Sequence, residues 1–194
     1  MDREIEEKLR LISSEISACR RCPLHRNRNR AVPGEGGFRR KILLIGEAPG
    51  AEEDRTGRPF AGRAGEVLDH LLASAGLSRE DVFITSVLKC RPPKNRDPKP
   101  EELEACRAWL DRQVEILRPR IIVPMGRFAL KYVSARYFIS FGKIGDVHGK
   151  VFTVKDKWGP VRIVPVYHPA AFLYRPDRLG VGERDMGVVG KIDV

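Results

Sequence analysis

An apolar strand that runs directly into a carboxylate and a tight turn constrains this chain more than any other stretch. Residues 41–45, "KILLI", are nearly continuously apolar, which is typical of a strand covered on both faces in a parallel sheet. The next residues include Gly46, Pro49 and Gly50, which favour a tight turn with close backbone approach. Ligands of open α/β sheets bind at such strand ends, and Glu47 lies there.

Further apolar segments repeat this pattern along the chain. Strands are predicted in "DVFITSVLKC" (81–90) and "RIIVPMG" (120–126), and residues 150–170 indicate two strands around a turn, with His168 after the second. Alternating strands and helices favour a parallel α/β sandwich with sites at the strand ends. Helices with an apolar stripe or a favourable start are predicted at about 3–17, 66–75, 100–117 and 127–134.

One domain is expected over residues 1–194, because a chain of this length supplies one ordinary core and shows no long linker. The polar stretch 51–65 is predicted to be a loop. So is "RPPKNRDPKP" (91–100), because its prolines cannot donate to a helix or a sheet. From about Gly180 the chain has little periodic content, and we expect a mobile tail over 180–194.

The chain is strongly basic, with a formal net charge of +10 and a pI of about 9.8. This balance favours attraction to a polyanion, and nucleic acid is the commonest polyanion inside cells. A basic surface that only faces solvent is the plainer explanation. The sequence has no apolar run long enough for a membrane span and no signal-peptide pattern, so we expect a cytoplasmic protein without a membrane partner.

The cysteines form two spaced pairs, C-x2-C and C-x15-C. Inside cells disulfides are disfavoured, and thiolates at short spacing indicate a metal site. Zinc and a 4Fe-4S cluster both accept four thiolates, so the spacing leaves both open, together with unligated core cysteines. Either metal group would close a loop of about seventy residues, and we expect a structural site. The cysteines are Cys19, Cys22, Cys90 and Cys106.

Four side chains are predicted to meet at one rim of the sheet. Glu47, Ser86 and His168 lie at or near strand ends, and Phe60 lies in the loop after the first strand. Three of them have a plain structural explanation: Glu47 as a turn cap, Phe60 as a core anchor and His168 as an exposed strand end. A phosphate-binding loop is excluded at "GEAPGAEED", which lacks the required lysine and hydroxyl residue.

Three motifs carry a resemblance to a known family. "GEAPGAEEDRTGRPFAGRAG", "SVLKCRPPKNRDP" and "VYHPAA", with the four spaced cysteines, closely resemble the family 4 uracil-DNA glycosylases, thermostable 4Fe-4S enzymes of archaea and bacteria. The resemblance runs from about Cys19 to Ala171. It implies a three-layer α/β/α sandwich with a central, mainly parallel four-stranded sheet. It also implies a structural 4Fe-4S cluster, in preference to zinc, on the four cysteines.

The resemblance further implies roles at the rim. Phe60 matches a phenylalanine that stacks on the extruded uracil, a contact worth about 1 to 3 kcal/mol. Gly46, Glu47 and Ala48 match the segment that contacts the base. His168 matches a histidine that donates to uracil O2, where negative charge develops as the base departs. Glu47 is then the candidate that stabilises the oxocarbenium-like sugar or deprotonates the attacking water.

The chain departs from the family pattern at Ser86. Most members have asparagine there, and a serine hydroxyl cannot reproduce both contacts of an amide, so an altered base preference is expected to be possible. Phe172, Leu173 or Tyr174 is predicted to fill the gap that a flipped base leaves. Phosphate contacts are expected from Arg91, Lys94, Arg96 and Arg175.

The sequence therefore predicts a monomeric, monofunctional uracil-DNA glycosylase that acts on single- or double-stranded DNA and leaves an abasic site. No catalytic metal is expected, and no lysine is placed by motif for a Schiff base. A sliding clamp is a further candidate partner. The alternatives are a glycosylase of the same superfamily with broader base specificity, a non-enzymatic metal-stabilised nucleic-acid-binding module, and a nucleotide-binding transferase that uses the "GEAPG" turn.

Overall fold

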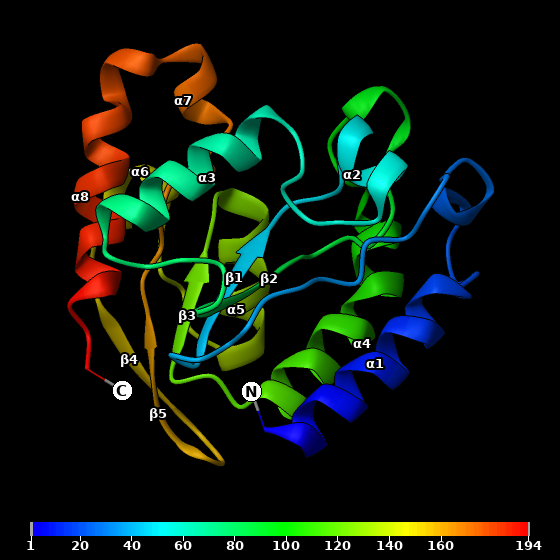
Figure 1. Ribbon diagram of the computed structural model, residues 1–194, viewed down its shortest axis with the longest axis horizontal. Coiled ribbons are helices and arrows are strands. Elements are labelled where there is room, and N and C mark those ends of the chain that lie inside the picture. The colour runs from blue at the N-terminus through cyan, green and yellow to red at the C-terminus, as the bar shows by residue number, and fades with distance from the viewer. Residues whose placement is uncertain (1, 194) are drawn as a thin grey trace.

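A five-stranded sheet forms the centre of the molecule, which the computed structural model describes for residues 2–193 (Figure 1). The strands are β1 (Ile42–Gly46), β2 (Val82–Ser86), β3 (Ile121–Pro124), β4 (Phe152–Asp156) and β5 (Gly159–Ile163). They lie in the order β2-β1-β3-β5-β4; the first four of these run parallel, and β4 is antiparallel to β5. The mainly parallel sheet is confirmed. The expected four strands become five because the β4–β5 hairpin adds an edge strand.

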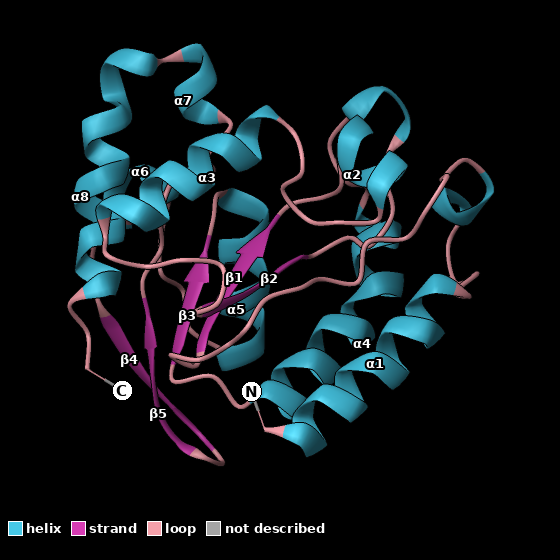
Figure 2. Cartoon of the chain, in the orientation of Figure 1, coloured by secondary structure: helices cyan, strands magenta, loops and turns pink. Residues whose placement is uncertain are grey.

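Helices cover both faces of the sheet and give the predicted three layers (Figure 2). One face carries α1 (Arg3–Ser17), α4 (Pro100–Leu117) and α5 (Arg127–Tyr137), and the other carries α3 (Arg63–Ser74) and α8 (Leu179–Gly190). The shorter helical segments are α2 (Ala51–Thr56), α6 (Ile144–Val147), α7 (Ala171–Tyr174), η1 (Pro23–Arg26), η2 (Pro93–Asn95) and η3 (Pro176–Arg178).

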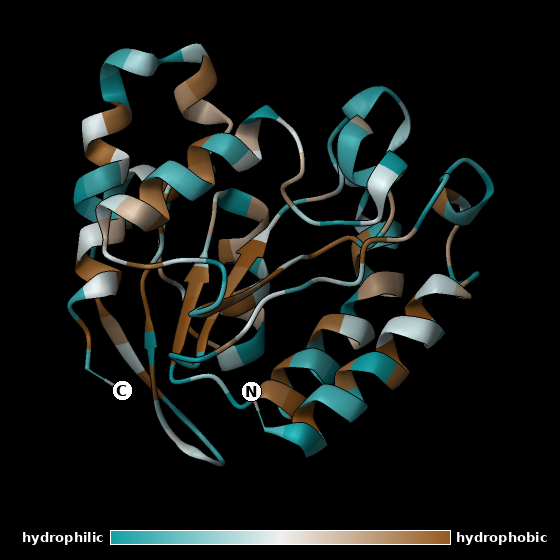
Figure 3. Ribbon diagram, viewed as in Figure 1, coloured by the Kyte–Doolittle hydropathy of each residue, from teal (hydrophilic) through white to brown (hydrophobic). Residues whose placement is uncertain are grey.

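Strand β1 shows how alternating side chains serve the two layers. Leu43 and Ile45 pack in the cluster formed with α1, α4 and α5, whereas Ile42 and Leu44 pack with α3 and α8. All four are fully buried. A strand covered on both faces has a continuous apolar sequence, which explains why β1 was predictable, and Figure 3 shows the central strands as the most hydrophobic part of the fold.

The two long helices α1 and α4 have the predicted boundaries. Helix α1 begins where the Asp2 side chain accepts the N–H of Glu4 at 3.0 Å. Helix α4 begins at Pro100, and the Glu102 carboxylate accepts the N–H of Lys99 at 2.9 Å. None of the helices within residues 2–193 combines the length and the apolarity that crossing a membrane requires.

The stretch 51–65, predicted to be a loop, contains α2. This short helix starts after Gly50, and the Glu53 side chain accepts the N–H of Gly50 at 3.0 Å. It ends at Gly57, whose φ of 76° is the left-handed conformation that stops a helix. The loop prediction was wrong here because the polar composition hid a capping pattern around a six-residue helix.

The segment expected to be a mobile tail instead forms α8. Met186 and Val189 are buried against the α3 side of the sheet. Four glycines lower the helix propensity of this stretch, and they interrupt the spacing of apolar residues by which a helix is recognised in a sequence. One of them has a packing role, since a Cβ on Gly182 would lie 2.7 Å from the Phe172 ring. Tertiary packing therefore overrides local propensity in α8.

Candidate active site

The carboxyl ends of β1 and β2 and the segment after β5 surround a cavity of about 310 Å³, which we call the strand-end cavity. A cavity at this edge of a parallel sheet is the usual ligand site of such folds. The structure brings the predicted rim residues together in it. Its lining includes Glu47, Ala48, Phe60, Ser86 and His168.

Gly46, also predicted to contact the base, is not among the lining residues; at the end of β1 it lets an aromatic ring that lines the cavity approach the strand. A Cβ at Gly46 would lie 2.9 Å from the Phe60 ring and 3.1 Å from Ser86 Oγ, so no larger residue fits without a shift. Phe60 itself has a φ of 50°, a conformation that side chains other than glycine rarely adopt. Its carbonyl accepts from Arg79 Nη2 at 2.7 Å. The loop thus fixes the Phe60 ring over Gly46.

Glu53 connects the two backbone segments that form one wall of the cavity. One carboxylate oxygen accepts the N–H of Gly50, and the other accepts the N–H groups of Ala61 and Gly62 at 2.9 and 3.1 Å. The start of α2 is thereby tied to the loop that carries Phe60. Sequence reasoning missed Glu53, although a glutamate three residues after a glycine N-cap is a recognisable capping signal.

His168 is neutral and has one assigned tautomer. The Ala170 N–H donates to His168 Nδ1 at 3.2 Å, so the ring proton is on Nε2. Burial lowers the pKa of His168 to about 4, although the nearby Glu53 opposes this shift. The imidazole stacks on Phe60 with ring centroids 5.5 Å apart. At neutral pH, therefore, this cavity contains an uncharged N–H donor.

Glu47 brings an unpaired carboxylate to the same cavity. Its backbone is anchored because the Leu88 N–H donates to the Glu47 carbonyl at 3.0 Å. Within residues 2–193 no group donates a hydrogen bond to the side-chain carboxylate. Burial raises the pKa of Glu47, the charge of Asp97 raises it further, and Arg127 opposes both. A half-buried carboxylate without a partner can accept a proton from water or face a developing cation.

Ser86 ends β2 beside Gly46 and is held through its backbone. Its carbonyl accepts from Lys89 Nζ at 2.8 Å, and the same ammonium donates to Thr85 Oγ1 at 2.5 Å and to Gln113 Oε1 at 2.7 Å. Lys89 is only 1% exposed, and burial lowers its pKa to about 7. This buried network fixes the end of β2, from which Ser86 reaches the cavity.

Comparison with known proteins identifies the family. A model of the uracil DNA glycosylase superfamily matches residues 33–185. This chain belongs to that superfamily. It is 48% identical to a type-4 uracil-DNA glycosylase of Archaeoglobus fulgidus, over 96% of this chain and 94% of that protein. It is 46% identical to a type-4 uracil-DNA glycosylase of Saccharolobus solfataricus, over 92% of this chain and 83% of that protein. It is 42% identical to a type-4 uracil-DNA glycosylase of Sulfurisphaera tokodaii, over 97% of this chain and 86% of that protein.

This member of the uracil DNA glycosylase superfamily also has its cysteines together, in what we call the cysteine corner. All four line one small hollow between the end of α1, the end of β2 and α4. The Trp109 Nε1–H donates to Cys19 Sγ at 3.3 Å, and Arg28 Nη1 donates to Cys90 Sγ at 3.1 Å. Among the described residues, no three histidine, cysteine or acidic side chains are close enough to hold a single metal ion.

The four basic residues expected at phosphates of the superfamily's DNA substrate differ in their surroundings. Arg96 lines the strand-end cavity, but its guanidinium makes two hydrogen bonds to the Glu102 carboxylate, at 2.9 and 2.6 Å. Arg175 pairs with Asp177 at 3.0 Å. Lys94 is exposed on the proline-rich loop. Arg91 is part-exposed and donates to Asn95 Oδ1 at 2.8 Å.

Two residues of the proline-rich loop, Asn95 and Arg96, line the strand-end cavity, which the sequence did not predict.

The three residues predicted to fill the gap left by a flipped base differ in exposure. Phe172 is 5% exposed and packs in the core, where Gly182 contacts its ring. Tyr174 is 84% exposed at the end of α7, and Leu173 is intermediate. Phe172 is therefore an anchor in this conformation, which leaves Leu173 and Tyr174 as the candidates.

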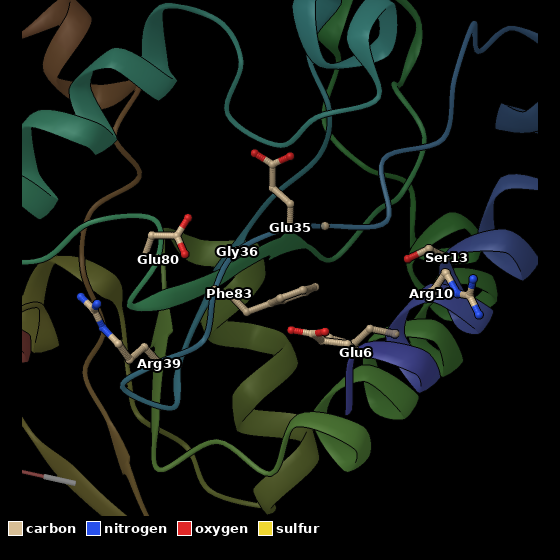
Figure 4. Close-up of a pocket in the computed structure, with 11 residues that line it drawn as sticks. Glu6, Arg10, Ser13, Glu35, Gly36, Arg39, Glu80 and Phe83 are labelled. Carbon is tan, nitrogen blue, oxygen red and sulfur yellow. The ribbon is translucent and has the colours of Figure 1, made fainter. Parts of the chain in front are cut away.

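Another hollow, of about 390 Å³, lies between α1 and the segment 34–39 (Figure 4). Glu6 and Arg10 border it on one side, and Glu35 and Phe83 on the other. It is open, its charges have both signs, and it contains none of the predicted site residues. This hollow is larger than the strand-end cavity, but the predicted catalytic and base-binding side chains line the strand-end cavity, where we place the candidate active site.

Proposed function

We propose that this protein is a monofunctional uracil-DNA glycosylase, which hydrolyses the N-glycosidic bond of deoxyuridine in DNA and leaves an abasic site. One observation carries the proposal. Glu47, which follows the first strand, and His168, which follows the last, line a single cavity together with Phe60. The identity of 48% to a type-4 uracil-DNA glycosylase over nearly the whole chain supports the same activity.

The nucleotide must leave the base stack before it reaches such a cavity. Extrusion costs a few kcal/mol in a duplex, and stacking of the base on an aromatic ring offsets part of that cost. Phe60 is the aromatic residue that suits this role, because its ring is fixed over Gly46 at the cavity floor. Ser86 is the candidate that contacts a polar edge of the base. Its hydroxyl both donates and accepts.

His168 is the proposed donor to the departing base. Negative charge develops on uracil as the bond breaks, so a donor placed at O2 stabilises the transition state more than the substrate. The Nε2–H tautomer that Ala170 selects supports this assignment. Because burial lowers the pKa of His168 to about 4, the donor is the neutral imidazole. A neutral donor does not protonate the base, so the leaving group departs as an anion stabilised by hydrogen bonding.

Glu47 is the proposed catalytic carboxylate. The sugar becomes oxocarbenium-like as the base leaves, and a water must then attack C1′. An ionised carboxylate favours both steps, since it stabilises the cation and accepts the proton of the water. Its lack of a hydrogen-bond donor within residues 2–193 leaves Glu47 available for that water.

We also propose that the cysteine corner binds a structural 4Fe-4S cluster. Four thiolates are the ligand set of such clusters, and N–H donors to the sulfurs, as from Trp109 and Arg28, are typical of them. Zinc also accepts four thiolates. The resemblance to the family 4 uracil-DNA glycosylases is what favours the cluster over zinc. When bound, it would join the end of α1 to the proline-rich loop and α4.

The DNA partner follows from the proposed activity, and the net charge of +10 supports it. Leu173 or Tyr174 is the proposed residue that fills the gap left by the flipped base. The monomeric state and the intracellular location stay predictions, and a sliding clamp stays a candidate partner.

A base-release assay tests the proposed function. Purified protein is incubated with oligonucleotides that each carry one damaged base, and alkali then reveals abasic sites. The proposal expects free uracil, with strand cleavage only after alkali. DNA binding without release of any base would support the non-enzymatic module instead. Release of other deaminated bases at rates comparable to uracil would support the broader-specificity glycosylase, which the serine at position 86 makes the second candidate.

A further inference from the structure

A second cavity lies on the opposite side of the segment that carries His168. Residues 166–168 continue from β5, and Val166 forms a parallel bridge with Met125. Neighbouring side chains of an extended segment point to opposite sides. His168 accordingly lines the strand-end cavity, whereas Tyr167 lines a separate cavity of about 420 Å³. We call it the arginine-rimmed cavity.

The floor of the arginine-rimmed cavity is aromatic and fixed. The Tyr167 ring lies against His148 with centroids 4.5 Å apart, and Phe172 meets it edge-on at 6.4 Å. His148 Nδ1 is within 2.8 Å of a carboxylate oxygen of Asp185, a buried residue of α8. These contacts give the cavity a stacking surface whose position does not depend on a ligand.

The rim is positively charged. Arg178, the last residue of η3, precedes α8, and Val181 and Arg184 lie in its first two turns; all three line the cavity. Within residues 2–193, neither Arg178 nor Arg184 lies within salt-bridge distance of a carboxylate. Their acidic neighbours are engaged elsewhere, since Asp185 contacts His148 and Glu183 contacts His70 at 2.7 Å.

This combination suits a nucleotide. Guanidinium groups bind phosphodiesters, and an aromatic ring stacks on a base without regard to its identity. Helix α7, with the exposed Tyr174, follows directly on the segment between the two cavities. If a residue of α7 fills the gap in the base stack, the extruded nucleotide lies on the side of α7 that faces the strand-end cavity. The strand opposite the lesion then lies on the side that faces the arginine-rimmed cavity.

We propose that the arginine-rimmed cavity binds a nucleotide of the DNA strand opposite the extruded uracil. Arg178 and Arg184 contact its phosphate, and Tyr167 contacts its base or sugar. The inference rests on the proposed glycosylase function and adds a binding site that serves duplex DNA specifically. Single-stranded DNA has no such nucleotide, so the two substrates are expected to differ in their dependence on these arginines.

The test compares the wild type with the double variant Arg178→Ala/Arg184→Ala, both as holoprotein. The probe is an oligonucleotide with one 2′-fluoro-deoxyuridine, whose electron-withdrawing fluorine opposes cleavage, used as a single strand and as a duplex. Fluorescence anisotropy measures Kd over a range of salt concentrations. We expect the duplex Kd to rise about tenfold or more, with a salt slope lower by about 1 to 2, and the single-strand Kd to change less than about twofold.

The variant Arg3→Ala/Arg10→Ala is the matched control, because it removes the same charge from exposed positions on α1. It is expected to change both Kd values by less than about twofold. Equal weakening of single-strand and duplex binding in the Arg178/Arg184 variant would overturn the inference, and so would an unchanged duplex Kd. Uracil release from single-stranded DNA by the wild type tests the glycosylase proposal separately, so either idea can fail alone.

Discussion

The strand-end cavity and the cysteine corner are both assembled from distant parts of the chain, but they are held together differently. In the cavity, backbone N–H groups and glycines fix the reactive side chains, as Ala170 does for His168 and Gly46 does for Phe60. In the corner, the sulfurs of Cys19 and Cys90 accept hydrogen bonds from separate segments of the chain. The comparison teaches that contacts within the chain fix the geometry of the cavity, whereas the corner, by our proposal, is completed by a bound cluster.

The largest effect is expected from a substitution that removes a catalytic group from the cavity and leaves the shape of the cavity unchanged. Glu47→Ala should lower single-turnover uracil release by about 10²- to 10⁴-fold, because the water loses its base and the sugar cation loses its counter-charge. Binding to uracil-containing DNA should stay within a few-fold of the wild type. Glu101→Ala, an exposed carboxylate on α4, is the control and should release uracil normally. Equal rates for the two variants would remove Glu47 from the mechanism.

The next effect falls on the corner. Cys106→Ser should abolish any iron-sulfur absorbance and lower the thermal unfolding midpoint by several degrees, because one of four ligands is lost. Uracil release by the folded fraction at a lower temperature should remain, since the cavity has its own contacts. Circular dichroism establishes the folded fraction. A variant that keeps the native spectrum but releases no uracil would mean that the corner takes part in the chemistry, and the comparison would fail.

A smaller effect is expected at the cavity floor. Gly46→Ala places a methyl group 2.9 Å from the Phe60 ring, so the ring or the strand must shift, at a cost of about 1 to 3 kcal/mol in unfolding free energy. Substrate binding should weaken more than the rate of the chemical step. Gly187→Ala on α8 is the matched control, because nothing lies within 4 Å of its added Cβ. Urea unfolding measures stability, and single-turnover kinetics measure binding and rate. If Gly46→Ala and Gly187→Ala gave the same results in both, the role of Gly46 would be contradicted.

The smallest effect concerns base choice. Ser86→Asn restores the amide found in most family 4 enzymes, and an amide offers both a donor and an acceptor to the base edge. We expect uracil release to change little and release of other deaminated bases to fall, so that selectivity rises by about tenfold. Competition between oligonucleotides carrying different bases measures this ratio. A selectivity identical to that of the wild type would show that backbone groups, rather than residue 86, choose the base.

Much of this architecture was predictable because buried strands and capped helices have local signals. Strand β1 and helix α4 follow from an apolar run and from a proline with acids in the first turn. The meeting of Glu47 and His168 in one cavity was also predictable, because parallel strands end at the same edge of a sheet.

Other features depend on contacts between distant residues, and sequence alone could not supply them. Glu53 matters because its carboxylate meets the backbone of residues 61 and 62, which only the folded loop brings near. The tautomer of His168 depends on the direction of one N–H group. Helix α8 was hidden by its glycines, whose low propensity is overridden by burial of Met186 and Val189.

The pH dependence of single-turnover uracil release tests the central claim most directly, that an ionised Glu47 and a neutral His168 act on one nucleotide. The proposed role of Glu47 requires its ionised carboxylate, so the rate should fall as the pH decreases through the pKa of Glu47, which burial raises above 4.5. His168, with its pKa lowered to about 4, should remain neutral over most of that range. In Glu47→Gln the residual rate should lose this dependence. A Glu47→Gln profile that parallels the wild type, or one that still loses rate near the ordinary histidine value of about 6.5, would contradict the account.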